Sequence, residues 1–149
     1  MTGAAEGLTV AYRAEGLEGL GELHVSARAT PFAGASVGYV NDADLLDWTR
    51  SLLVYPWSTT ARPQISSALG DQKTLNLTAF TVTGRGQLAV SVHLATVDTD
   101  AHSPTTGTVS EARLLVLTTY EAVHRFANDL AAAISNAGGS AHLDLEELA

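Results

Sequence analysis

Histidine is the side chain whose charge changes closest to neutral pH, so the five histidines are the first candidates for acid–base catalysis or metal binding. His24 and His93 occupy outward positions in two predicted strands, and they would share one side of a sheet if those strands are neighbours. Catalysis would also require a positioned partner within hydrogen-bonding distance of one ring. Histidines exposed on strands are common, so we expect both to be surface residues.

The densest group of potential metal ligands is the motif Asp98-x-Asp100-x-His102 in a polar segment. Oxygen-rich loops of this kind can bind calcium, but the EF-hand pattern, with its central glycine and terminal glutamate, is absent. A solvated acidic loop explains the motif better than a metal site. A small hydrolase or metal-dependent enzyme that uses His24, His93, or Asp98 with Asp100 and His102 is the alternative, and it requires a pocket in which these groups converge.

The remaining motifs do not indicate catalysis or a cofactor. The chain contains no cysteine, which excludes disulfides, thiolate nucleophiles and zinc–thiolate sites. It lacks the G-x-S-x-G motif of serine hydrolases, and its glycines do not have dinucleotide-binding spacing. Glu18 and Glu22 could act as a carboxylate pair only within a cleft, so we expect them to be surface charges. We therefore predict no catalytic residue, no metal ligand and no bound cofactor.

Composition and charge indicate the class of partner. The 149 residues suit one domain, and 46% hydrophobic with 16% charged residues is typical of a folded globular protein. Eight basic and sixteen acidic residues give a formal net charge of -8, which disfavours nucleic-acid binding and favours a basic protein partner. The N-terminal residues have neither a basic leader nor an apolar run, and no later stretch reaches transmembrane length. We therefore expect a cytoplasmic protein that does not bind a membrane.

Four residues are candidates for contact with a protein partner. Tyr55 and Trp57 lie in a connection rich in proline and serine, residues 55–72, where an exposed tryptophan could anchor an interface. A tryptophan folded back over the edge of the core is the other explanation, and the one that we favour. Arg85 lies between two glycines in the turn of a predicted hairpin, and His93 lies on the outer face of that hairpin.

Alternation of apolar and polar residues predicts the first strands that must position these candidates. Residues 8–14 and 20–29 alternate with period two, and residues 36–40 are predicted to form a short third strand. The first helix begins at Asn41 or Asp42, either of which can cap it, and ends before a proline. Its apolar side follows three- and four-residue spacing and comprises Leu45, Leu46, Trp48, Thr49, Leu52 and Leu53.

The clearest pattern is a hairpin over residues 74–94. Its inward positions are Leu75, Leu77, Ala79, Leu88, Val90, Val92 and Leu94. Phe80 and Val82 have the opposite parity, which a β-bulge or burial on both faces would explain. An apolar strand over residues 112–117 then leads into a second helix, for which Thr118 and Glu121 match a capping box. The buried stripe of that helix would comprise Val123, Phe126, Ala127, Leu130, Ala131 and Ile134.

These elements predict a single α+β domain over residues 1–149. Its core is a mainly antiparallel sheet of about five or six strands with two helices packed largely on one face. We expect residues 1–7 to be frayed. The tail, residues 137–149, is loose unless the alternation at residues 142–145 adds an edge strand.

Several short motifs follow one another along residues 20–136. They are Phe32-x-Gly34, Asp44-Leu45-Leu46-Asp47-Trp48, Leu75-x-Leu77-Thr78, Val90-x-Val92-x-Leu94, Leu115-x-Leu117-x-x-Tyr120 and Phe126-x-x-x-Leu130. In this order they resemble small uncharacterised actinobacterial α+β proteins. The layout is also similar to that of immunity proteins, which protect a bacterium from its own wall-associated contact toxin.

The resemblance implies stoichiometric protein binding without turnover, with a toxin as the partner. Contact residues vary among such immunity proteins, so none is assigned here by transfer. A self-associating structural module, in which a sheet edge or outer face forms a homodimer, is a further alternative.

Overall fold

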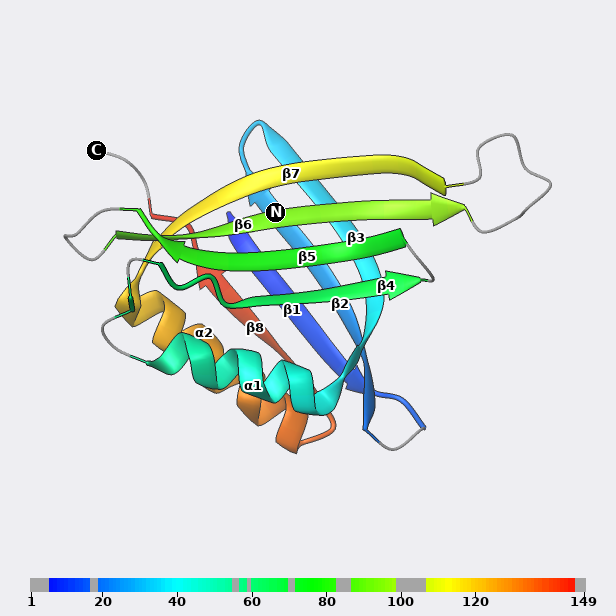
Figure 1. Cartoon of the computed structure of the whole chain (residues 1–149), viewed down its shortest axis with the longest axis horizontal. Coiled ribbons are helices and arrows are strands. Elements are labelled where there is room, and N and C mark those ends of the chain that lie inside the picture. Colours follow the sequence, from blue (N-terminus) through cyan, green and yellow to red (C-terminus); the bar gives the residue numbers. More distant parts are fainter. Residues whose placement is uncertain are drawn as a thin grey trace, which may run out of the picture.

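The chain folds into two antiparallel sheets and two helices in a computed structural model (Figure 1). The structure describes residues 6–16, 19–54, 57–58, 60–69, 72–82, 87–98 and 107–146, with the backbone alone at 68–69, 72–73, 97–98 and 107–109. The predicted α+β class, the antiparallel pairing and the two helices are confirmed within these residues. The described part of the chain contains eight strands, however, and they are divided between two four-stranded sheets.

The first sheet has the strand order β3-β2-β1-β8. It comprises β1 (Gly7–Ala14), β2 (Leu20–Ala29), β3 (Phe32–Asn41) and β8 (Gly138–Asp144). The structure confirms the predicted alternation in β1 and β2. The residues that point inward are all buried: Leu8, Val10, Tyr12, Leu23, Val25 and Ala27. The third strand is longer than predicted, because the small residues that follow Phe32 at positions 33–36 show no hydrophobic pattern. Of the two alternatives for the tail, the structure shows the edge strand: β8 pairs with β1.

The second sheet has the strand order β4-β5-β6-β7. It comprises β4 (Gln64–Leu69), β5 (Gln72–Thr81), β6 (Gln87–Asp98) and β7 (Gly107–Thr119). The β5–β6 register runs without a shift from Leu75 opposite Leu94 to Thr81 opposite Leu88, so of the two explanations for the switch in parity the bulge is wrong. Phe80 instead lies half-buried on the outer face, with the Arg62 guanidinium 5.0 Å from its ring centroid.

Each helix follows directly from the last strand of a meander. In α1 (Asp42–Leu53) the cap is Asn41, whose Oδ1 accepts a hydrogen bond from the Ala43 amide at 2.8 Å. In α2 (Tyr120–Ser135) the cap is Thr119, whose Oγ1 accepts from the Ala122 amide at 3.2 Å. The predicted capping box was therefore placed one residue too early. Glu121 instead contacts Arg125 at 3.3 Å on the helix surface.

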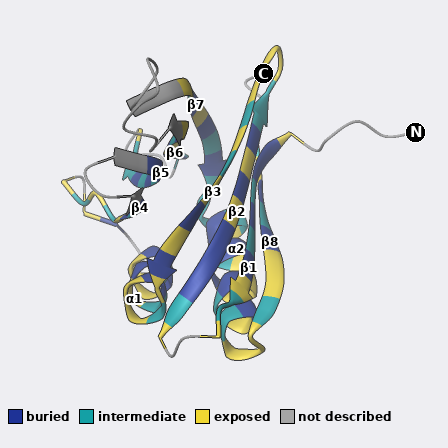
Figure 2. Ribbon diagram, turned by 90° about the vertical axis from the view of Figure 1, so that its right-hand side faces the viewer, coloured by how far each residue is buried: buried dark blue, intermediate teal, exposed yellow. Residues whose placement is uncertain are grey.

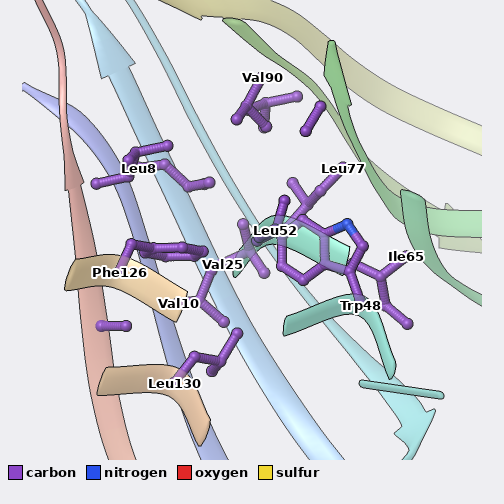
Figure 3. Packing of buried hydrophobic residues seen from close by; sticks show 14 of the residues in the cluster. Leu8, Val10, Val25, Trp48, Leu52, Ile65, Leu77, Val90, Phe126 and Leu130 are labelled. Atoms are coloured by element: carbon purple, nitrogen blue, oxygen red, sulfur yellow. The ribbon is translucent and has the colours of Figure 1, made fainter. Parts of the chain in front are cut away.

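The core lies where the two sheets and the two helices meet (Figure 3). The inner face of the first sheet packs against α2 along β8 and β1 and against the second sheet along β3. The α1 and α2 helices pack side by side, and the Trp48 and Phe126 rings meet edge to face at 6.1 Å. The buried residues of α2 are Val123, Phe126, Ala127, Leu130 and Ala133, whereas Ala131 and Ile134 are half-buried. Neither described helix has the length and apolar character needed to cross a membrane.

Candidate partner-binding surface

The outer face of the first sheet is left uncovered by the described helices and strands (Figure 2). Strand register brings its side chains into rows: Ser26 lies between Thr9 and Ala35, His24 between Ala11 and Val37, and Glu22 between Arg13 and Tyr39. We call these nine residues the outer sheet face. Small side chains in the middle rows leave a shallow hollow of about 630 Å³, which extends to the end of the second sheet.

Large apolar side chains are exposed along β3, at the edge of this face. Val37 is 44% exposed and Tyr39 51%, and both lie on the outer sheet face, whereas Phe32, which is 69% exposed, lies on the opposite side of β3 by register. On the opposite side of β3, Gly38 lies against Ser67 and Thr74 of the second sheet, which leaves no room for a side chain at that position. The strand therefore uses glycine where the sheets approach each other and displays apolar and aromatic side chains to solvent.

A polar cluster closes one end of the outer sheet face. Glu22 is only 8% exposed, and its Oε1 accepts hydrogen bonds from Arg13 Nη2 at 3.0 Å and from His24 Nε2 at 2.5 Å. The Tyr39 hydroxyl also donates to this carboxylate. The hydrogen bond from His24, aided by the Arg13 charge, lowers the pKa of Glu22 despite its burial. The negative charges of Glu15 and Glu22 raise the pKa of Tyr39.

This cluster is suited to recognition rather than to proton abstraction. A carboxylate with a lowered pKa and three hydrogen-bond donors is a weak general base at neutral pH. Its hydrogen bonds instead hold Arg13, His24 and Tyr39 in defined orientations, while the outer parts of these side chains stay in solvent. Arginine and tyrosine are among the residue types that contribute most to the energy of protein interfaces.

The two candidate histidines are not brought together. His24 lies on β2 in the first sheet, whereas His93 lies on β6 in the second sheet, opposite Asn76 and Arg113. His93 is paired with an acidic group of the neighbouring strand, since Glu111 Oε2 is 3.6 Å from His93 Nε2. An enzyme site that combines the two histidines is therefore not formed.

The predicted acidic loop lies mostly outside the described residues. The Asp98 backbone ends β6, opposite Gly107, and its side chain is not described. Asp100 and His102 lie outside the described ranges. Within those ranges, no group of three or more histidine, cysteine, aspartate or glutamate side chains is placed to hold a metal ion.

Among the predicted partner contacts, Trp57 is buried, so it offers no exposed anchor for an interface. It is 6% exposed, its Nε1 donates to the Leu52 carbonyl at 3.2 Å, and its ring meets Tyr120 edge to face at 5.7 Å. The favoured explanation, a tryptophan folded over the core edge, is confirmed. Tyr55 and Arg85 lie outside the described residues.

The sequence predicts Glu22 to be a surface charge and does not indicate the cluster that forms around it. The alternation of Glu22 and His24 along one strand was a usable signal, because residues two apart share a face. Arg13 and Tyr39 come from neighbouring strands and join the cluster through pairing register. Glu18, the other member of the expected pair, lies outside the described residues.

No protein-family model matches this sequence, and no curated protein or solved structure is significantly similar to it.

Proposed function

We propose that this chain is a non-enzymatic protein-binding module whose contact surface is the outer sheet face. The observation that carries the proposal is the uncovered side of the first sheet, with Val37 and Tyr39 exposed along β3. Apolar and aromatic side chains grouped on one surface, beside an ordered arginine, are characteristic of binding sites for proteins.

The specific form of the proposal is an immunity-type role, in which the module neutralises a basic toxin by stoichiometric binding. The net charge of -8 supports this partner, because it attracts a basic protein over long range and speeds their encounter. Acidic residues of the outer sheet face contribute little to that charge, since Glu22 is paired with Arg13. Attraction by the rest of the molecule and contact through an apolar face are therefore separate contributions.

Self-association is the second candidate, because the same face and the edge strand β3 could meet their equivalents in another copy. Two copies related by a two-fold axis would present the same apolar row to each other. An enzyme is less well supported: Glu22 has a lowered pKa, and the half-exposed His24 is already paired with this carboxylate.

The test compares the effects of substituting one valine and one leucine, which have similar exposure and lie on different sheets. Val37 on the outer sheet face is 44% exposed, and Leu115 on the second sheet is 49% exposed. Tagged protein at micromolar concentration, mixed with lysate of its own source, should retain one partner in stoichiometric amount. Val37→Asp should reduce this capture at least about tenfold, because it places a charge in the apolar contact, whereas Leu115→Asp should not.

Circular dichroism melting curves establish that both variants are folded. Equal loss of the partner in both variants, or no partner retained by the unaltered protein, would contradict the proposal. Light scattering coupled to gel filtration distinguishes self-association: a dimer that Val37→Asp converts to monomer favours a homodimer over a foreign partner.

A further inference from the structure

The outer face of the second sheet carries a polar groove of different chemistry. It is a hollow of about 470 Å³, and we call its lining residues the arginine groove: Arg62, Asn76, Thr78, Phe80, Ser91, His93 and Arg113. Register places Asn76, His93 and Arg113 side by side across β5, β6 and β7. Thr78 and Ser91 form the next row. Two cationic side chains thus flank a floor of amide, imidazole and hydroxyl groups.

The arginine groove is a positive site on a negative protein. It contains two of the seven arginines of a chain whose net charge is -8. Arg62 is held by its stacking over Phe80, at 5.0 Å from the ring centroid, so its guanidinium is partly preorganised. The Arg113 side chain is 73% exposed. Both cations are therefore accessible to a ligand from solvent.

A carboxylate already lies beside this groove, but its contacts there are long. Glu111 Oε1 is 4.0 Å from Arg113 Nε, and Glu111 Oε2 is 3.6 Å from His93 Nε2. Charge-assisted hydrogen bonds between such groups are about 2.7–2.9 Å. His93 Nε2 is buried without a hydrogen-bond partner among the described residues. The hydrogen-bonding capacity of the groove is thus incompletely used by Glu111.

The separation of the two arginines determines what could occupy the groove. Arg62 stacks on β5, and Arg113 lies on β7, two strand spacings away, which is about 10 Å. They also lie in different rows, since Phe80 is four residues from Asn76 along β5. An extended segment with several negative groups can reach both cations, because alternate side chains of such a segment are about 7 Å apart.

We propose that the arginine groove binds an acidic peptide segment, whose carboxylates contact Arg62 and Arg113. Asn76 and Ser91 supply hydrogen bonds to the same segment, whereas the Thr78 hydroxyl already donates to Asn76 Oδ1 at 2.8 Å. A nucleic acid fits the groove less well, because it would require an exposed aromatic face on which to stack its bases. The face of Phe80 is covered by Arg62, so this ring is not free to stack on a base. This site is independent of the outer sheet face and of the function proposed for it.

The experiment uses a fluorescein-labelled octaglutamate peptide with fluorescence anisotropy as the readout and octaglutamine as the neutral control. Octaglutamate should bind and octaglutamine should not. Arg62→Ala and Arg113→Ala should each weaken binding about fivefold, the equivalent of one exposed ion pair. Arg50→Ala is the matched control, because Arg50 is also 73% exposed and pairs with Asp47 on α1 at 3.3 Å. It should leave the affinity unchanged.

Glu111→Gln gives the sharpest test, because it should tighten octaglutamate binding several-fold by removing the competing carboxylate. Glu121→Gln is the matched control. It also removes one negative surface charge, which pairs with Arg125 at 3.3 Å, and it should have little effect on octaglutamate binding. Equal tightening by both substitutions would overturn the proposal, since net charge alone would explain it. The proposal would also be overturned if Arg113→Ala bound octaglutamate as tightly as the unaltered protein does. The same holds if an oligothymidylate of equal length bound better than octaglutamate.

Discussion

Tyr12 links the first strand to the first helix through one buried hydroxyl group. Its side chain is 3% exposed, and its hydroxyl donates to Asp42 Oδ1 at 2.7 Å, at the beginning of α1. Gly21 makes room for the ring, because a Cβ at that position would overlap it. Burial first, and then the hydrogen bond and charge of Asp42, raise the pKa of Tyr12 to about 12.

Tyr12 therefore predicts a loss of stability in alkali. The unfolded chain has a tyrosine pKa of about 10, so the folded state holds this proton more tightly. The resulting stabilisation is complete below about pH 10 and is lost as the pH rises toward 12, by an amount on the order of 2 kcal/mol. Urea unfolding should be measured between about pH 9 and pH 12, a range that covers the rise of the pKa. Over this range the free energy of unfolding should decline less for Tyr12→Phe than for the unaltered protein. Parallel declines would contradict the assignment.

At the scale of elements, the junction between β7 and α2 depends on two adjacent threonines with opposite roles. Thr119 Oγ1 caps the helix by accepting from the Ala122 amide. Thr118 is fully buried, and its Oγ1 has no hydrogen-bond partner among the described residues. Only one of the two hydroxyl groups therefore stabilises the helix.

Substitutions at these positions should have opposite signs. Thr119→Ala should lower the free energy of unfolding by about 1 kcal/mol, because it removes the cap, while Thr119→Ser should retain most of the stability. Thr118→Val preserves the side-chain shape and removes a buried unpaired hydroxyl, so it should be neutral or stabilising. Chemical denaturation measures all three. A larger loss at Thr118 than at Thr119 would restore the cap position that the sequence suggested.

At the scale of the whole molecule, the two sheets are joined where β3 crosses the second sheet. Gly38 faces Ser67 and Thr74, whose hydroxyl groups are 2.7 Å apart. A Cβ at position 38 would overlap Ser67 Oγ and lie 2.7 Å from Thr74 Oγ1. The close approach of the sheets at this point therefore requires a residue without a side chain.

Gly38→Ala should destabilise the protein by about 1–3 kcal/mol, the usual range for overpacking a filled site. Gly16→Ala is the control, because no atom lies within 4 Å of the added methyl group. Thermal unfolding followed by circular dichroism compares the two. If the two variants melt at the same temperature, the sheets can accommodate a methyl group at this crossing, and the prediction is wrong.

The arrangement of the sheets also separates two chemically different outer surfaces. The first sheet displays small, apolar and aromatic side chains, whereas the second displays the arginine groove. The inner faces meet each other and the helices in one core. A module of this kind can present two independent contact surfaces without a second domain.

The sequence by itself determined the features that depend on near neighbours along the chain. Alternation identified the inward residues of β1, β2, β5 and β6, and a capping residue with helical spacing placed α1. These patterns are local, because the repeat of a strand is two residues and that of a helix is under four. For the same reason, Trp48 could be assigned to the core before any tertiary contact was known.

Only the tertiary structure decided how the elements combine. A period-two pattern does not say which strand is the neighbour, so it could not divide eight strands between two sheets or pair β8 with β1. The same pairing separates His24 from His93 and gathers Arg13, Glu22 and Tyr39. Partner and register depend on closing contacts between distant segments into one packed core, and the candidate surfaces exist only after that choice has been made.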